Sequence, residues 1–179
     1  MLRTETRRDR YNGKLKNAKK YPISLCAVNF VFDDNLGYLI RSAACFGAER
    51  LYVIGHVPER KILNPLSGSL YDYVEIVQFA NPREFLKYSK NEKIKLISAE
   101  LVEEARSIST YDFDFDRHIC LVVGNEQCGI PIEILRNSDI IYVPMPGAGY
   151  CLNTSQAANI ILYETVLQYE REKENGCFM

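Results

Sequence analysis

The sequence predicts an α/β fold in which a mostly parallel β-sheet carries helices on both faces. Short runs of Val, Ile, Leu and aromatic residues recur along the chain, and segments with helical spacing lie between them. Strands that are apolar on both faces and alternate with helices are typical of a parallel sheet covered on both sides. The 179 residues, 47% of them hydrophobic and 25% charged, are enough for one globular domain with a buried core.

Six apolar runs are the expected strands, at 24–32, 51–54, 74–79, 94–98, 119–123 and 140–145. Four other segments are expected helices, at 36–46, about 82–90, 131–137 and about 154–172. Asn35 and Asn81 are suited to cap two of these helices, because an asparagine side chain accepts a hydrogen bond from the first turn, and Pro82 fits a first helical position. Residues 56–72 follow no clear pattern.

A basic arm, residues 1–23, precedes the domain expected over residues 24–175. Residues 1–20 carry eight basic and two acidic side chains, whereas the rest of the chain carries 14 basic and 21 acidic ones. A basic arm on an acidic body favours attraction to a polyanion such as RNA. A solvated, partly disordered terminus is the alternative, and composition supports both equally.

Several classes of protein are not expected from this composition. No apolar run approaches the roughly 20 residues of a membrane span, and no apolar segment follows the charged N-terminus as a secretory signal would. The six cysteines include no C-x-x-C pair and the two histidines lie far apart, so we expect neither a disulfide framework nor a metal centre. Reduced cysteines indicate a cytoplasmic protein.

The loop after the last expected strand, VPMPGAGYCLN (143–153), resembles a phosphate loop without its charge. Glycines between a strand and a helix often hold phosphate, yet the chain has no lysine or arginine between Ile140 and Tyr169. A neutral or cationic ligand held by main-chain groups and apolar walls fits such a loop better. S-adenosylmethionine, which has a sulfonium cation and no phosphate, is a ligand of this kind.

Two further stretches carry candidate site residues. In VVGNEQCGIP (122–131), Gly124 permits close approach of a ligand beside the Glu126 carboxylate, but a simple turn before the next helix explains the same residues. Arg41 is the only charge between Leu36 and Gly47, so we expect a partly buried guanidinium with an anionic partner. A structural ion pair, with Glu126 as a candidate partner, is favoured by chemistry alone over a functional role.

Three motifs follow one another in a fixed order: N-x-G-x-x-x-R-x-A-x-x-F-G at 35–47, L-V-x-G-N-E-x-x-G-I-P at 121–131, and V-P-M-x-G-x-x-x-C-L-N-x-S-x-A-A at 143–158. Together they resemble the SpoU (TrmH-like) branch of the SPOUT RNA methyltransferases, which methylate ribose 2′-hydroxyls with S-adenosylmethionine. The likeness covers about residues 24–170, nearly everything except the basic arm.

The resemblance implies a fold, an assembly and a set of site residues. Members of this family have a C-terminal deep trefoil knot and form homodimers with active sites near the subunit interface. By motif position the cofactor-binding residues are Ala99, Gly124, Val143 and Leu152, and the catalytic-site residues are Arg41, Asn35, Glu126, Asn153 and Cys151. The family usually has serine where this chain has Cys151, and a thiol donates a weaker hydrogen bond than a hydroxyl.

The resemblance implies methyl transfer from S-adenosylmethionine to a ribose 2′-hydroxyl of tRNA or rRNA. We favour tRNA as the substrate, because the sequence adds only a short arm to the domain and no separate RNA-binding domain is expected. The alternative is a non-catalytic RNA-binding member of the same fold. The replacement of serine by Cys151 favours this alternative, and the presence of Arg41 argues against it. A nucleotide-binding enzyme of another doubly wound family is a third reading, against which the missing phosphate motifs argue.

Overall fold

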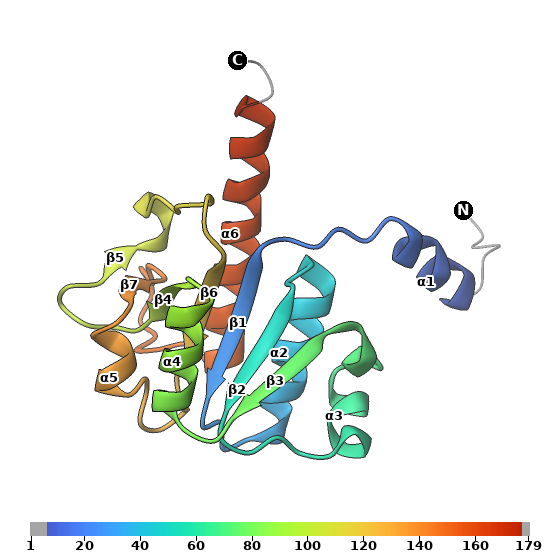
Figure 1. Cartoon of the computed structure of the whole chain (residues 1–179), viewed down its shortest axis with the longest axis horizontal. Coiled ribbons are helices and arrows are strands. Elements are labelled where there is room, and N and C mark those ends of the chain that lie inside the picture. The colour runs from blue at the N-terminus through green and yellow to red at the C-terminus, as the bar shows by residue number, and fades with distance from the viewer. Residues whose placement is uncertain (1–6, 177–179) are drawn as a thin grey trace.

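Residues 7–176 of this chain are described by a computed structural model, in which one parallel sheet runs through the molecule (Figure 1). The seven strands lie in the order β3-β2-β1-β6-β4-β7-β5, and every neighbouring pair is parallel. Residues 1–6, which include Arg3 of the basic arm, lie outside the described residues, as does Cys177. The strands are β1 (Ile23–Val28), β2 (Arg50–Ile54), β3 (Glu75–Phe79), β4 (Lys95–Ala99), β5 (Arg106–Ser107), β6 (Ile119–Val123) and β7 (Asp139–Tyr142).

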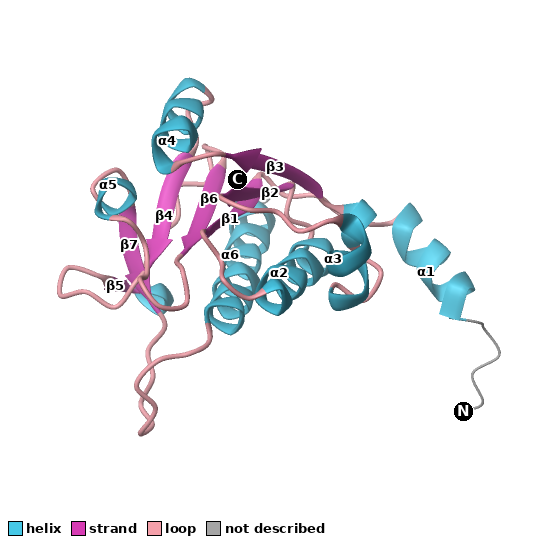
Figure 2. Cartoon of the chain, turned by 90° about the horizontal axis from the view of Figure 1, so that it is seen from below, coloured by secondary structure: helices cyan, strands magenta, loops and turns pink. Residues whose placement is uncertain are grey.

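Helices cover both faces of the sheet, as the sequence predicts. Figure 2 shows α4 and α5 above the sheet and α2, α3 and α6 below it. The helices are α1 (Arg7–Lys16), α2 (Asp33–Phe46), α3 (Arg60–Leu66), α4 (Pro82–Asn91), α5 (Ile132–Leu135) and α6 (Thr154–Gly176), with short 3-10 turns at Tyr71–Tyr73 and Ile108–Thr110. Helix α1, within the basic arm, stands apart from the body of the molecule in both views (Figures 1 and 2).

The core has two layers, one on each side of the sheet. Alternate residues of the central strands face opposite sides, so Leu25 belongs to the layer under α2 and α6, and Cys26 to the layer under α4 and α5. Both side chains are fully buried. Burial on both faces explains why β1 reads as a continuous apolar run in the sequence.

All six expected strands are present within a few residues of their expected positions. The two-residue strand β5 was not expected, since a strand this short has no pattern of its own. The capping prediction is right for Asn81, whose side chain accepts a hydrogen bond from Glu84 N at 3.1 Å.

The capping prediction is wrong for Asn35, because α2 begins at Asp33 and Phe32 occupies the N-cap position. Asn35 lies inside the first turn, where its side chain is only 5% exposed and bonds to other loops instead of its own helix. The helix expected over 131–137 is also shorter, because α5 ends at Leu135.

The unassigned stretch 56–72 contains α3, which packs against α2. The contact is close at Gly37, where a Cβ atom would lie 2.4 Å from the Cβ of Leu66. The glycine of the first motif is therefore explained by helix packing, since a side chain at this position would push α3 away from α2.

Candidate functional site

A pocket of about 550 Å³ opens where β4, β6 and β7 end. Its walls are the loops that follow these three strands, with Phe32 and Asn35 from the start of α2. We call it the carboxyl-edge pocket, since the carboxyl ends of parallel strands are where ligands bind in open α/β sheets. Among the predicted site residues, it is lined by Ala99, Gly124, Val143, Leu152, Asn35, Glu126, Asn153 and Cys151.

The loop after β6 forms one wall by folding back on itself. Asn125 and Gly129 exchange main-chain hydrogen bonds of 3.1 and 3.0 Å, and Gly129 has a positive φ of 67°. A Cβ at Gly124 would lie 2.4 Å from the carbonyl carbon of Gly129. Gly124 is thus required by the chain's own turn, whether or not a ligand also approaches it.

A chain of hydrogen bonds joins the three motifs inside this pocket. Asn35 Nδ2 donates to Glu126 Oε1 at 2.6 Å, and Asn153 Nδ2 donates to Asn35 Oδ1 at 2.9 Å. These bonds connect α2, the loop after β6 and the start of α6. Because both amide groups have fixed partners, their orientations in the pocket are determined by the fold.

Glu126 is held in place by main-chain donors as well. Its Oε2 accepts a hydrogen bond from Val31 N at 2.9 Å, and its Oε1 accepts a longer one from Phe32 N at 3.3 Å. Burial raises the pKa of this carboxyl, but the hydrogen bonds from Val31, Asn35 and Phe32 outweigh burial and bring the pKa below its usual value. Glu126 is therefore an anion at neutral pH that fixes Asn35.

Asn153 caps the long helix α6. Its Oδ1 accepts hydrogen bonds from the main-chain N–H groups of Ser155 at 2.9 Å and Gln156 at 3.3 Å. The next residue ties the helix to the sheet, because Thr154 Oγ1 donates to the Gly124 carbonyl at 2.9 Å. The cap places Asn153 Nδ2, with one N–H bound to Asn35, at the pocket wall.

Arg41 does not line this pocket, and the expectation that it is partly buried and paired is wrong. It is exposed and has no hydrogen bond or ion pair with any residue that the structure describes. Its guanidinium lies over Gly68, where a Cβ would be 3.4 Å from Arg41 Nη1. Glu126, the partner that chemistry suggested, lies in the loop after β6 and accepts a hydrogen bond from Asn35 in the first turn of α2 instead.

Glu100 is a lining residue that the sequence reasoning missed, although it lies within the ISAEL segment that gave Ala99. Its two carboxylate oxygens accept hydrogen bonds from Leu101 N at 3.1 Å and Ile130 N at 3.2 Å. Glu100 and Glu126 are the only charged residues lining the pocket within residues 7–176. The pocket is therefore electrically negative, which favours a cationic or neutral ligand over a phosphate.

Ser155 is a second site residue that the sequence analysis did not predict, although it is the serine of the N-x-S pattern in the third motif. Its Oγ lies 2.7 Å from Asn153 Oδ1 and 3.3 Å from Asn35 Oδ1, and the residue is buried. The serine hydroxyl closes the network on the side away from the pocket.

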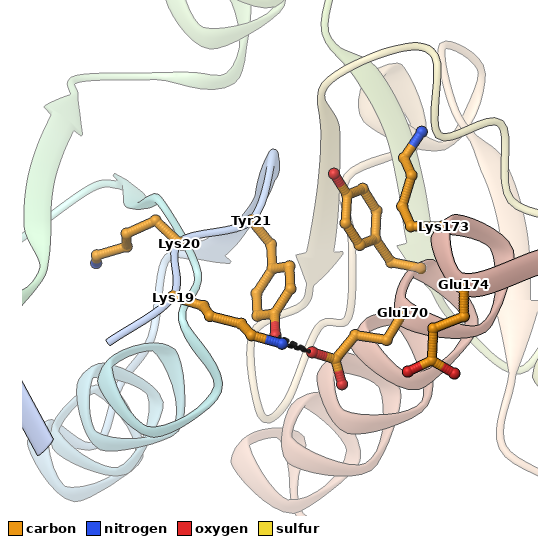
Figure 3. A pocket seen from close by; sticks show the side chains of 7 residues that line it. Lys19, Lys20, Tyr21, Glu170, Lys173 and Glu174 are labelled. Atoms are coloured by element: carbon orange, nitrogen blue, oxygen red, sulfur yellow. Dashed lines mark hydrogen bonds and ion pairs between the residues drawn. The ribbon is translucent and has the colours of Figure 1, made fainter. Parts of the chain in front are cut away.

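A second pocket, of about 560 Å³, lies at the opposite edge of the sheet, where the arm joins β1 (Figure 3). Lys19 Nζ donates to Glu170 Oε1 at 2.6 Å, and the Tyr21 hydroxyl donates to the same oxygen at 2.5 Å. Lys20 Nζ donates to the carbonyl of Ala48 at 2.9 Å. None of the predicted site residues lines this pocket, so we assign these contacts to anchoring the arm.

Residues 7–176 offer neither a metal site nor a membrane-spanning helix. No group of three or more His, Cys, Asp or Glu side chains there could hold a metal ion. None of the helices in that range is long and apolar enough to cross a membrane.

Comparisons with known proteins identify the relatives of this chain. The model of a family described as the SpoU rRNA Methylase family matches residues 22–163. A 23S rRNA (uridine(2479)-2′-O)-methyltransferase from Streptomyces viridochromogenes is 33% identical over 140 residues, which are 75% of this chain and 48% of that protein. A tRNA (guanosine(18)-2′-O)-methyltransferase from Aquifex aeolicus is 30% identical over 148 residues, which are 82% of this chain and 69% of that protein.

A solved structure agrees with the fold. The SpoU methyltransferase AviRb from Streptomyces viridochromogenes, in complex with the cofactor AdoMet, superposes with a TM-score of 0.74 at 25% identity. The alignment covers 88% of this chain and 65% of that one. The chain spans about half the length of the Streptomyces 23S rRNA relative, 48%, and about two thirds of the length of the Aquifex one, 69%.

Proposed function

The chain belongs to the SpoU rRNA methylase family, and we propose that it transfers a methyl group from S-adenosylmethionine to a ribose 2′-hydroxyl of RNA. The observation that carries this proposal is the carboxyl-edge pocket, because three motifs distant in sequence meet there around one hydrogen-bonded network. Residues 24–175 are the catalytic domain in this proposal, and residues 1–23 are an RNA-binding arm.

The pocket suits S-adenosylmethionine in size and charge. Its volume of about 550 Å³ lies within the range of small-molecule sites, roughly 300–1,000 Å³. Ala99, Gly124, Val143 and Leu152 offer main-chain groups and apolar walls for the cofactor. The negative charge of Glu100 and Glu126 favours the sulfonium cation, and it favours the product less, because the product has lost that positive charge.

Asn35, Asn153 and Cys151 lie where a ribose would meet the cofactor. In-line attack requires the 2′-oxygen to be held along the axis of the methyl–sulfur bond, and amide groups fixed by Glu126 provide oriented hydrogen-bond partners for the ribose. Glu126 acts through Asn35 and is a positioning residue. Cys151 contributes a side chain of suitable size at the pocket mouth.

In our proposal the protein is a homodimer, and Arg41 of one protomer completes the site of the other. The α2–α6 surface beside it exposes Tyr38, Tyr163 and Ile160 by 49, 50 and 41%. An exposed apolar surface of this kind is typical of a subunit interface. A second copy docked there brings Arg41 of one protomer to the pocket of the other, where a guanidinium would clamp the RNA phosphate beside the reacting ribose.

Two finer features belong to the same proposal. The C-terminal part is threaded as a trefoil knot. The path of the chain supports this feature, because β4 separates β7 from β6 in the sheet, and yet Thr154, which follows β7, bonds to Gly124 at the end of β6. The protein works in the reducing cytoplasm, which is consistent with the free thiols of its described cysteines.

The proposed function is tested by measuring S-adenosylmethionine binding by calorimetry and methyl transfer from labelled cofactor to bulk tRNA and bulk rRNA. We expect cofactor binding and label in ribose 2′-O-methyl nucleosides, and the labelled pool distinguishes tRNA from rRNA substrates. A protein that binds RNA but neither binds the cofactor nor transfers methyl groups would be a non-catalytic member of the fold. That result would overturn the proposal.

A further inference from the structure

Two aromatic side chains stand at the mouth of the carboxyl-edge pocket. Tyr150, in the loop between β7 and α6, is 92% exposed, and Phe32, before α2, is 55% exposed. Both line the pocket together with Asn35 and Asn153. An aromatic ring exposed to water forgoes the favourable free energy of burial. Two exposed rings at one pocket mouth therefore indicate a ligand-binding surface.

The two rings are held differently. Phe32 is fixed through its main chain, whose N–H donates to Glu126. Tyr150 has no ring contact or hydrogen bond with any residue in the described range 7–176, and all of residues 146–151 are exposed. Gly147 and Gly149 have nothing within 4 Å of an added Cβ. The Tyr150 ring is therefore free to move against a bound ligand.

The charges around the mouth select the kind of ligand. No lysine or arginine of the described chain lines the pocket, and the acidic residues Asp33 and Asp34 are exposed directly after Phe32. These residues offer a phosphate group no cation to bind, whereas the face of a nucleobase is uncharged and stacks on aromatic rings. Stacking requires that the base is not already stacked within a double helix.

We propose that Tyr150 and Phe32 form an aromatic rim that stacks on an unpaired base next to the methylated ribose, so that the substrate is a nucleotide in a loop or single-stranded segment of RNA. This inference rests on the proposed function for the identity of the ribose. It adds a residue-level reason why the enzyme would reject the same sequence in a duplex. Stacking at Tyr150 would also close the glycine loop over the ribose.

The first test uses the absence of tryptophan from the chain. Tyr150→Trp introduces one fluorophore at the rim, and Ile132→Trp introduces one at a control position that is 61% exposed on α5 and does not line the pocket. A short unstructured RNA should quench the fluorophore at 150 and leave the one at 132 unchanged. The same RNA annealed to its complement should quench neither. Equal quenching at both positions, or equal quenching by the duplex, overturns the proposal.

The second test separates stacking from a merely structural role. Tyr150→Phe should keep RNA affinity, and Tyr150→Leu and Tyr150→Ala should weaken it about 10-fold, because only an aromatic ring stacks. The KM for RNA should rise with no change in cofactor affinity or in the sedimentation coefficient. Unchanged affinity in Tyr150→Ala, or dissociation of a dimer by that change, overturns the aromatic rim.

The two proposals fail in different ways. If wild type methylates RNA and the Tyr150→Ala and Phe32→Ala variants do so with the same KM, the rim is wrong and the proposed function stands. If wild type transfers no methyl group while unstructured RNA quenches the fluorophore at 150, the rim stands and the proposed function is wrong.

Discussion

Arg41 lies outside the pocket that contains the other predicted site residues, and this separation makes its role testable. Arg41→Ala should lower the methyl-transfer rate by at least about 100-fold, because the ribose-phosphate loses its clamp. Cofactor affinity should stay within error of wild type. Arg41→Lys should also be poor, since an ammonium group cannot reproduce the planar guanidinium. Single-turnover transfer and calorimetry measure the two effects, with the exposed Arg117→Ala, at the opposite edge of the sheet, as control.

Mixing variants tests whether Arg41 acts from the partner subunit. A heterodimer of Arg41→Ala and Asn153→Ala chains has one complete site only if Arg41 and Asn153 of the same site come from different protomers. We expect recovered activity after the two inactive variants are mixed. Wild-type turnover in Arg41→Ala alone would contradict the assignment of this residue altogether.

Cys151 stands where the resemblance to the family leads us to expect serine, and it lies exposed at the pocket mouth. If its role is to fill space, Cys151→Ser should keep the fold and equal or raise the transfer rate, because a hydroxyl is a stronger donor of similar size. Cys151→Ala should lose less than about 10-fold, the rate equivalent of one ordinary hydrogen bond. Inactivity of both variants beside an active wild type would show that the thiol takes part in the chemistry.

At the scale of the element, the turn after β6 depends on Gly124, and Gly147 in the loop after β7 provides a control position. Gly124→Ala would put a Cβ 2.4 Å from the Gly129 carbonyl carbon and 2.7 Å from Ile130 N, both main-chain atoms that cannot rotate away. We expect a loss of about 1–3 kcal/mol in the free energy of unfolding and weaker cofactor binding. Gly147→Ala, where nothing lies within 4 Å, should change neither quantity. Urea unfolding of both variants decides this, and equal stability would show that the turn can open freely.

The amino ends of β1 and β6 are joined by a histidine whose protonation should limit stability in acid. His118 Nε2 lies 2.8 Å from Ser24 Oγ, and its Nδ1 lies 3.5 Å from the Glu49 carboxylate. Burial lowers the pKa of His118, Glu49 raises it and Arg50 lowers it, and the net pKa is below the usual value. The folded protein thus holds the neutral ring, while the unfolded chain protonates near pH 6.5.

The stabilising effect of neutral His118 is complete above about pH 6.5 and is lost as the pH falls below it, because protons then bind preferentially to the unfolded chain. His118→Gln, which cannot titrate, should reduce the fall in unfolding free energy between about pH 7.5 and about pH 5.5. Urea melts at both values measure it, with exposed His56→Gln as the control. An unchanged pH dependence in His118→Gln would mean that folding does not lower the pKa of His118.

At the scale of the whole molecule, the basic arm and the carboxyl-edge pocket lie at different ends of the sheet, and α1 stands apart from the body (Figure 1). Residues 1–16 carry six basic and two acidic side chains. Deleting them should weaken RNA binding and flatten its salt dependence by about 0.7 in logarithmic slope for each phosphate of single-stranded RNA that the arm neutralises in the full chain. Binding titrations over a salt series give that slope.

The deletion should end at Lys16, because Lys19 and Lys20 bind Glu170 and the Ala48 carbonyl and belong to the body. Cofactor affinity and thermal stability should then equal those of the full chain. Equal RNA binding by both proteins at every salt concentration would make the arm a solvated tail.

The sequence by itself determined the parts that follow from local pattern. Strands buried on both faces need continuous apolar runs, so β1 and β6 could be predicted from the sequence. Asn81–Pro82 marked the start of α4, because a helix cap depends on local hydrogen bonding alone. Motif order also identified the residues that line the pocket, such as Gly124 and Asn153, because their types are required by the turn and the helix cap that they form.

Only the tertiary structure decided how distant segments meet. From local sequence Asn35 is predicted to be a helix cap. In the structure its side chain instead donates a hydrogen bond to Glu126, 91 residues away, and this bond orders the site. Arg41 reads as buried because its helix is apolar, yet the helix turns that position outward to solvent. Such outcomes depend on long-range packing and on which face each helix presents. No local spacing contains that information, because the partner of each polar group is chosen by the fold.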